Sequence, residues 1–329
     1  MLNVLFSVRA SLKHSLTGYP HKHKMCAKNN IDEAAANEVC GSCGIAAGDN
    51  VKLLLCNACK LIKYCSVDCQ KNHRSQHKKA CKKKARELHD DKLFTQPDRT
   101  HEGECPICFI PHSLDLSKSA MMSCCSKVIC NGCEYFNMLR ERDEGLEHKC
   151  AYCRSPYPKD EEEIQQNRKR RLDADDDIAI RQLGTQCCVR GDDVGAVEHW
   201  KKAAKLGNNR AHYELGVMYQ NGRGVEKDMK KSVHHMEVSA IGGNPKARYF
   251  LGQYENLEKK NIKRAVMHWE IAAKLGYDEA LEKLNECFVE GVIPLGLHGN
   301  IVLAHRAAID ATKSTQREAA YAARAAKLF

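Results

Sequence analysis

The second half of the chain repeats an apolar pattern with the spacing of one helix turn. An alanine is followed four residues later by a leucine in four places: Ala179 and Leu183, Ala211 and Leu215, Ala247 and Leu251, Ala280 and Leu284. Residues four apart lie on one face of a helix, so each pair indicates a buried helix face. A glycine follows the leucine in the first three copies and would let a second helix approach closely. Each copy predicts an antiparallel pair of helices.

A second motif recurs in register with the first. The stretch from His199 to Gly207 is closely repeated from His268 to Gly276, and a third copy begins at His235. Self-similarity at a step of about thirty-odd residues is typical of a helical solenoid. The closing glycines predict the ends of the second helices. We interpret the recurring histidines, and the tryptophans beside two of them, as packing residues of a copied unit rather than as a metal ladder.

These copies resemble the Sel-one-like repeat, a relative of the tetratricopeptide repeat. The fullest copy runs from Ala211 to Gly243, and the array is expected to span 178–290. The resemblance implies a concave surface that binds extended peptides or another protein. A degenerate fourth copy should face water, and capping helices are expected over 291–329. The helical half is therefore expected to recognise a protein client.

Cysteine, rather than apolar periodicity, organises the first half. Of the 19 cysteines, 15 fall between Cys40 and Cys153, mostly as closely spaced pairs. Such pairs can reach one tetrahedral zinc ion from a tight turn. The alternative is a disulfide framework, but that belongs to secreted chains, and we expect no secretory signal here. The pattern predicts about four structural zinc ions, each with a full set of protein ligands.

The first cysteine group, over 39–82, resembles a MYND zinc finger. The resemblance rests on a stretch that reads Cys65, Ser66, Val67, Asp68, Cys69, Gln70, followed by His77, Lys78 and Cys81. It implies interleaved ligation, in which each ion joins segments that are distant in sequence. The two ligand sets would be Cys40, Cys43, Cys65 and Cys69, and Cys56, Cys59, His77 and Cys81. The family often has an aromatic residue where this chain has Asn72 and His73, so a groove for proline-rich peptides is less secure than zinc binding.

The second group, over 104–156, resembles a RING finger. The resemblance implies one ion held by Cys105, Cys108, Cys130 and Cys133. The other ion would take Cys150 and Cys153 together with Cys124 and Cys125. Lys127 stands where the family usually has a ligand histidine, and a protonated lysine cannot coordinate a metal. His112 or His148 remains an alternative to one of the two adjacent cysteines.

The RING resemblance also implies a partner. RING ubiquitin ligases bind a ubiquitin-conjugating enzyme and position its ubiquitin for attack, without a catalytic residue of their own. The matching partner-binding positions are Ile107, between the first two ligands, and Arg154, directly after the last. Alternatively, Ile107 fills a gap beneath the zinc knuckle and Arg154 solvates a loop. Ala151 replaces a proline that is common in ligases, so enzyme activity is left open and no catalytic residue is assigned.

The distribution of charge bears on the remaining classes of function. The formal net charge is +10, with basic runs at 78–86 and 168–171. The second run is flanked by acidic residues, which is typical of a charged linker, expected at 157–177. A helical linker is expected at 83–103. Because no aromatic residues are interleaved with the basic runs, nucleic acid is the least favoured partner.

The combined prediction is small zinc-stabilised α+β fingers followed by an all-α helical-hairpin solenoid. This order of modules resembles expanded families of diatoms and related algae. No apolar run is long enough for a membrane span, so we expect a cytoplasmic or nuclear protein. Residues 1–38 are expected to form a disordered basic tail with a weak transit-peptide character, and Met25 is an alternative start. We predict an interaction adaptor, with a ubiquitin ligase and then a nucleic-acid-associated regulator as alternatives.

Overall fold

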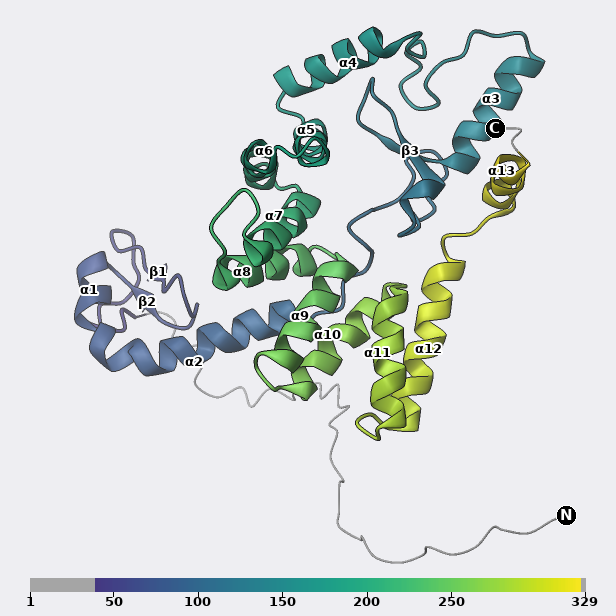
Figure 1. The fold of residues 1–329 in the computed structure, drawn as a ribbon. Coiled ribbons are helices and arrows are strands. Elements are labelled where there is room, and N and C mark those ends of the chain that lie inside the picture. Colours follow the sequence, from purple (N-terminus) through teal and green to yellow (C-terminus); the bar gives the residue numbers. More distant parts are fainter. Residues whose placement is uncertain (1–38, 327–329) are drawn as a thin grey trace, which may run out of the picture. The chain divides into compact units, whose positions relative to one another are not determined.

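The computed structural model describes residues 39–326 (Figure 1). The basic tail expected at 1–38 lies outside this range. The chain forms two compact units, and the boundary between them falls between Arg86 and Glu87, within helix α2 (Arg74–Leu93).

The described part of the first unit, residues 39–86, is a small finger with almost no aliphatic core. Its strands β1 (Leu54–Leu55) and β2 (Lys63–Tyr64) pair antiparallel, and α1 (Val67–Asn72) and the first part of α2 follow. Ser66 begins α1, because its hydroxyl accepts a hydrogen bond from the backbone N–H of Cys69 at 3.2 Å. The buried apolar residues of this unit are Tyr64, Cys40, Cys56, Cys59 and Cys81. Apolar burial alone therefore gives this unit little stability.

A second finger opens the second unit. The 3-10 helix η2 (Leu116–Lys118) precedes the antiparallel strands β3 (Ser119–Met121) and β4 (Val128–Cys130), and α3 (Asn131–Asp143) follows directly. Met122 and Ile129 are buried among cysteines. The Sγ atom of Cys130 begins α3 by accepting a hydrogen bond from the N–H of Cys133 at 3.4 Å. Cys130 thus caps α3 and also belongs to the buried cysteine cluster.

The rest of the second unit is helical, which confirms the predicted fold class. Its helices are α4 (Glu161–Asp173), α5 (Asp177–Val189), α6 (Asp193–Lys205), α7 (Asn209–Asn221), α8 (Met229–Ile241), α9 (Pro245–Leu257), α10 (Ile262–Lys274), α11 (Asp278–Val289), α12 (Leu295–Asp310) and α13 (Thr315–Ala325). Helices α5 with α6, α7 with α8, and α9 with α10 pack as hairpins, and α12 packs on α10 and α11.

The glycines that follow the repeated leucines lie where paired helices touch. A Cβ atom on Gly184 would lie 2.7 Å from Nε1 of Trp200, and one on Gly252 would lie 2.3 Å from Nε1 of Trp269. Both tryptophans are buried. These glycines are needed because the indole ring of the second helix occupies the space of a side chain. Each repeat therefore packs a tryptophan or, in the middle copy, Met236 against a glycine.

Polar side chains set the helix boundaries at regular intervals. The repeat helices begin at residues whose side chains accept backbone N–H groups of the first turn: Asp176, Asp192, Asn208, Asp228, Asn244 and Asn261. Such caps satisfy otherwise unpaired donors. Gly207, Gly243 and Gly276, just after the second helices, have φ angles of 93°, 87° and 86°. The second helix of each repeat therefore ends just before the glycine that the sequence pattern predicts.

The segments between modules are packed rather than free. Leu93, at the end of α2, is 1% exposed and packs against Met236 and Leu251 of the repeats. Both oxygens of Asp90 accept hydrogen bonds from Arg264, at 3.0 and 3.1 Å. The segment that we expected to be a charged linker, 157–177, contains α4, and Leu172 of that helix packs against the first repeat.

The two helices at the end of the described chain have different neighbours. Helix α12 completes a fourth hairpin with α11, whereas α13 lies against α3 of the second finger (Figure 1). Only α12 thus covers the end of the repeats. No helix between residues 39 and 326 has both the length and the apolar character that a membrane crossing requires.

Candidate metal centres

The structure brings the candidate metal ligands together in four groups. Within each group the ligand atoms lie within 4.8 Å of one another: Cys40, Cys43, Cys65 and Cys69; Cys56, Cys59, His77 and Cys81; Cys105, Cys108, Cys130 and Cys133; Cys124, Cys125, Cys150 and Cys153. These are the sets that the two finger resemblances imply. Each set offers four protein donors and leaves no open position, as in structural zinc sites.

The first two groups interleave along the chain. Cys43 Sγ lies 3.6 Å from Cys65 Sγ, and Cys65 Sγ lies 3.5 Å from Cys69 Sγ. In the second group, Cys59 Sγ lies 3.2 Å from Nε2 of His77. His77 and Cys81 reach the site from successive turns of α2. The ligand pairs of the two groups therefore alternate along the chain, and each group links two segments that are separated in sequence by a pair of the other group.

His73 supports the ligand His77. Its Nδ1 atom lies 3.0 Å from the Tyr64 hydroxyl, and its half-buried ring stacks on the ring of His77 at 5.7 Å with an interplanar angle of 10°. Partners outside the ligand set commonly fix the orientation of a ligating imidazole. His73, which stands where the MYND family often has an aromatic residue, therefore packs inside this finger.

The thiol pKa values differ within one metal group. Burial raises the pKa of Cys56, but hydrogen bonds from the Cys59 backbone and the His77 ring outweigh it and lower this pKa to about 6. Burial and the hydrogen bond to Cys56 raise the pKa of Cys81 to about 11. Neighbouring thiolates repel one another, so full deprotonation needs a positive ion between them. Zinc, with its preference for four sulfur and nitrogen donors, fits all four groups.

The third and fourth groups belong to the second finger. Cys108 Sγ lies 3.8 Å from Cys130 Sγ, and Cys124 Sγ lies 3.3 Å from Cys153 Sγ. Cys125, although adjacent to Cys124, also reaches the fourth group.

The histidines considered as substitutes lie outside these groups. His148 Nδ1 is 2.8 Å from Oε2 of Glu141, and His112 is buried without joining a group. The ammonium group of Lys127 lies 6.0 Å from the centre of the Tyr152 ring. The fourth group is therefore made of cysteines alone.

The two positions assigned to partner binding differ in exposure. Arg154 donates to Oδ1 of Asn137 at 2.8 Å and to Oε1 of Glu141 at 3.1 Å. The Glu141 side chain is 2% exposed, and although burial raises its pKa, hydrogen bonds to His148 and the Lys149 backbone lower it overall. Arg154 thus neutralises a buried carboxylate. Ile107, in contrast, is 37% exposed, close to Phe109, which is 72% exposed.

Comparisons with known protein families agree with the first finger and the repeats. Residues 38–81 match the MYND finger family. Residues 178–208, 209–244 and 245–277 match the Sel1 repeat. Beyond the matched repeats, α11 packs on α10, and α12 packs on both α10 and α11.

Two curated relatives each match a short part of this chain. Over 56 residues the chain is 38% identical to the DAP3-binding cell death enhancer 1 of Rattus norvegicus and 34% identical to that of Mus musculus. The segment covers 17% of this chain and 11% of each relative, so the chain matches a small part of those proteins.

Two solved structures align with part of this chain. A Sel1 repeat protein from Oxalobacter formigenes aligns with a TM-score of 0.40 at 21% identity, over 53% of this chain and 72% of that one. A protective antigen of uropathogenic Escherichia coli with an SLR fold aligns with a TM-score of 0.35 at 22% identity, over 60% of this chain and 40% of that one. The present chain thus carries a MYND finger and three Sel1 repeats, and between them a second, RING-like cluster of cysteines.

Proposed function

We propose that this chain is a zinc-stabilised adaptor, whose repeats bind a client protein while a zinc finger docks a second protein. The observation that carries this proposal is an aromatic cavity of about 510 Å³ on the repeats. Its aromatic lining comes from helices α7 and α9 and the turn before α11: Tyr213, Tyr249, Phe250, Tyr254 and Tyr277. Aromatic side chains supply large, rigid contact area for a peptide.

The polar lining of this cavity suits an extended peptide. Gln220, Gln253 and Lys246 lie among the aromatic residues, and Gln253 donates to the hydroxyl of Tyr249 at 2.9 Å. Amide groups can pair with the backbone of a bound segment, while the rings cover its side chains. Each of the four metal groups has four protein donors, which favours a structural role over metal catalysis.

A site-specific photo-crosslinker tests the client interaction. A crosslinking residue at Tyr249 should capture a defined protein in cells, and the same residue at Met267, which is 41% exposed on α10, should not. Tyr254→Ala should reduce the yield from Tyr249 without lowering the melting temperature substantially, because Tyr254 lines the cavity but does not pack against a core cluster of the described residues. Equal capture from both positions would argue against a specific client groove.

A ubiquitin ligase is the second candidate, favoured by the exposed pair Ile107 and Phe109. Two apolar side chains on the metal knuckle offer a small surface to a ubiquitin-conjugating enzyme. The hydrogen bonds of Arg154 to Asn137 and Glu141 support a structural role for that residue instead. A ubiquitin-discharge assay with the full chain tests this candidate: activity that Ile107→Ala abolishes selects the ligase, and a folded, zinc-loaded but inactive chain selects the adaptor.

A further inference from the structure

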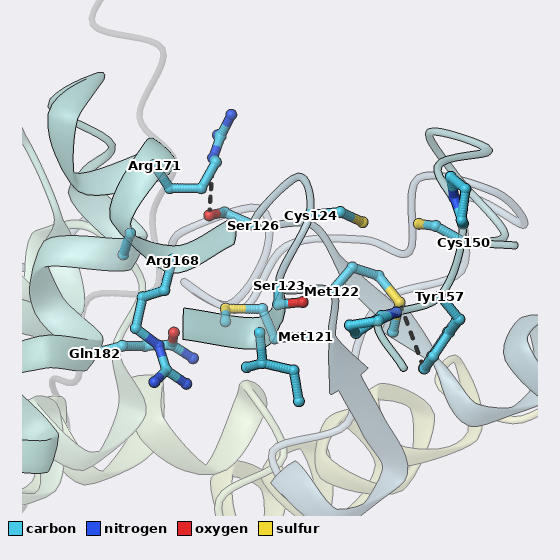
Figure 2. Close-up of a pocket in the computed structure, with 14 residues that line it drawn as sticks. Met121, Met122, Ser123, Cys124, Ser126, Cys150, Tyr157, Arg168, Arg171 and Gln182 are labelled. Carbon is cyan, nitrogen blue, oxygen red and sulfur yellow. Dashed lines mark hydrogen bonds between the residues drawn. The ribbon is translucent and has the colours of Figure 1, made fainter. Parts of the chain in front are cut away.

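An arginine-lined cavity of about 330 Å³ lies inside the second unit. The finger contributes Ser119, Met121 and Val128, and the helices contribute Arg168 from α4, Arg181 from α5 and Arg210 from α7. An adjoining cavity of about 290 Å³ shares Met121, Arg168 and Gln182 with it (Figure 2). The finger and the first two repeats therefore build one polar site together.

One of the three arginines is already paired with an acid. Nη1 of Arg210 lies 3.4 Å from Oε1 of Glu102, and Nε2 of His101 lies 3.0 Å from the same oxygen. Burial raises the pKa of Glu102, but the His101 hydrogen bond and the charges of His101 and Arg210 lower it overall. Glu102, the acidic residue in the cavity lining, is therefore ionised and shared between two partners.

Arg181 has no such partner. Within residues 39–326 its guanidinium makes no ion pair or hydrogen bond, and Glu214, Glu102 and Asp177 act on it only at longer range. Burial and the nearby charge of Arg210 lower its pKa. A guanidinium nevertheless keeps its proton in proteins, so this site holds a half-buried positive charge without a direct acidic partner.

In the described part of the chain, the hydrogen-bond partners of the Arg168 side chain are neutral. Its Nη1 atom donates to Oε1 of Gln165 at 3.0 Å. With the Gln186 amide in its hydrogen-bonding orientation, the amide oxygen accepts from both terminal nitrogens of Arg168, at 3.0 and 3.2 Å. Figure 2 shows Arg168 and Gln182 at one end of the adjoining cavity. The amides orient the guanidinium without neutralising it.

We propose that this cavity binds a phosphomonoester group. Arg168 and Arg181 bring two positive charges that have no direct acidic partner among the described residues, and a phosphomonoester carries a charge of about −1.5 to −2 at neutral pH. Several guanidinium donors also suit its three acceptor oxygens better than the two oxygens of a carboxylate. The group would come from a phosphorylated side chain of a bound protein or from a free phosphate. This proposal does not rest on the aromatic cavity of the repeats.

Methyl NMR of the full chain tests the proposal, because Met121 lines the cavity and its methyl group reports on occupancy. The chain, labelled at the methionine methyl groups, is titrated with inorganic phosphate, with a phosphoserine peptide and with the same peptide without phosphate. We expect a saturable shift of Met121 with the two phosphate-bearing probes only. Tighter binding of the phosphopeptide identifies a modified protein as the source, and tighter binding of inorganic phosphate identifies a free phosphate.

Substitutions assign the shift to the arginines. Arg168→Gln and Arg181→Gln should each weaken phosphate binding by about tenfold or more, since charge-assisted hydrogen bonds are lost. Arg190→Gln removes an exposed arginine at the end of the same helix α5 and should change nothing. Arg181→Lys keeps the charge without the fork and should weaken binding less than Arg181→Gln.

Two results would overturn the proposal. One is a Met121 resonance that does not move in millimolar phosphate. The other is binding that survives unchanged in both glutamine variants while the remaining methionine resonances show them to be folded. If the glutamine variants do not fold, the Arg181→Lys variant decides, because wild-type affinity in that variant would also contradict a site that depends on the guanidinium fork.

Discussion

The guanidinium of Arg317 lies 3.5 Å from the sulfur of Cys108. The same Arg317 group donates to the carbonyl oxygen of Ile110 at 2.9 Å and to that of Pro111 at 2.6 Å, and the residue is 1% exposed. Helix α13 is therefore anchored to the knuckle of the third metal group, where its positive charge complements the thiolates.

Replacing Arg317 should loosen the second finger. In Arg317→Met the carbonyl groups of Ile110 and Pro111 lose their donors, and we expect a loss of about 2–4 kcal/mol of stability. Urea unfolding measures this loss. Arg306→Met, at an exposed position on α12, serves as the control and should change stability by less than about 0.5 kcal/mol. Similar losses in both variants would contradict the anchoring role.

Two helical glycines should respond in opposite directions to alanine. A Cβ atom on Gly132 of α3 would lie 3.1 Å from the backbone of Arg317, whereas one on Gly299 of α12 would meet open space. Gly132→Ala should therefore cost about 1–3 kcal/mol by pushing α13 away. Gly299→Ala should stabilise by up to about 1 kcal/mol through helix propensity. Thermal unfolding distinguishes the two, and a stabilising Gly132→Ala would show that α13 does not pack closely there.

Zinc removal should affect the fingers far more than the repeats. The first unit buries Tyr64 and cysteines, so chelation should unfold it, while the apolar core of the repeats keeps most of the helical circular dichroism signal. Cys56→Ser should lower the zinc content by about one ion per chain. Metal analysis and circular dichroism measure both effects. A chain that stays compact without metal, or whose thiols form disulfides, would contradict the zinc assignment.

Acidification should destabilise the repeats through His235. Burial, together with the nearby His212, His234 and Lys201, lowers the pKa of His235 to about 4. An unfolded histidine titrates near 6.5, so the unfolded state binds more protons between pH 6.5 and 4, and stability falls as the pH drops through that range. The contact between the Nδ1 atoms of His212 and His235, at 3.0 Å, also requires a neutral ring.

The variant His235→Gln isolates this contribution. Its melting temperature should fall less between pH 7 and pH 5 than that of the unaltered chain, although acid releases zinc equally from both. His199→Gln, at the corresponding position of the first repeat, is the matched control. If both variants show the same acid sensitivity as the unaltered chain, the His235 environment does not govern the pH response.

The fold could be predicted from the sequence where local spacing determines it. The alanine and leucine pairs four residues apart repeat one packing interaction, and the glycine beside Trp200 or Trp269 follows from the same copied unit. Closely spaced cysteines likewise restrict the ligand sets, because each pair must share one ion. The RING-like motif predicts a partner-binding position for Arg154, but the motif does not indicate its hydrogen bonds to Asn137 and Glu141.

The contacts between modules could not be predicted in this way. Leu93 ends a helix whose other residues are mostly polar, so one buried leucine leaves no periodic pattern. Arg317 lies in an alanine-rich helix that reads as a cap for the repeats, yet its partners are Cys108 and the following carbonyl groups. Such contacts depend on the complete fold, since the residues are far apart in sequence and neither has a motif of its own.

The separation of 209 residues between Cys108 and Arg317 has a consequence for synthesis. The cysteines of the third metal group emerge from the ribosome well before α13 exists, so their sulfur atoms are uncovered while the repeats are still being made. Metal can therefore bind to the third group before α13 is synthesised, and α13 then packs over the metal-bound loop. A nascent chain interrupted before Arg317 would carry this finger without its cover.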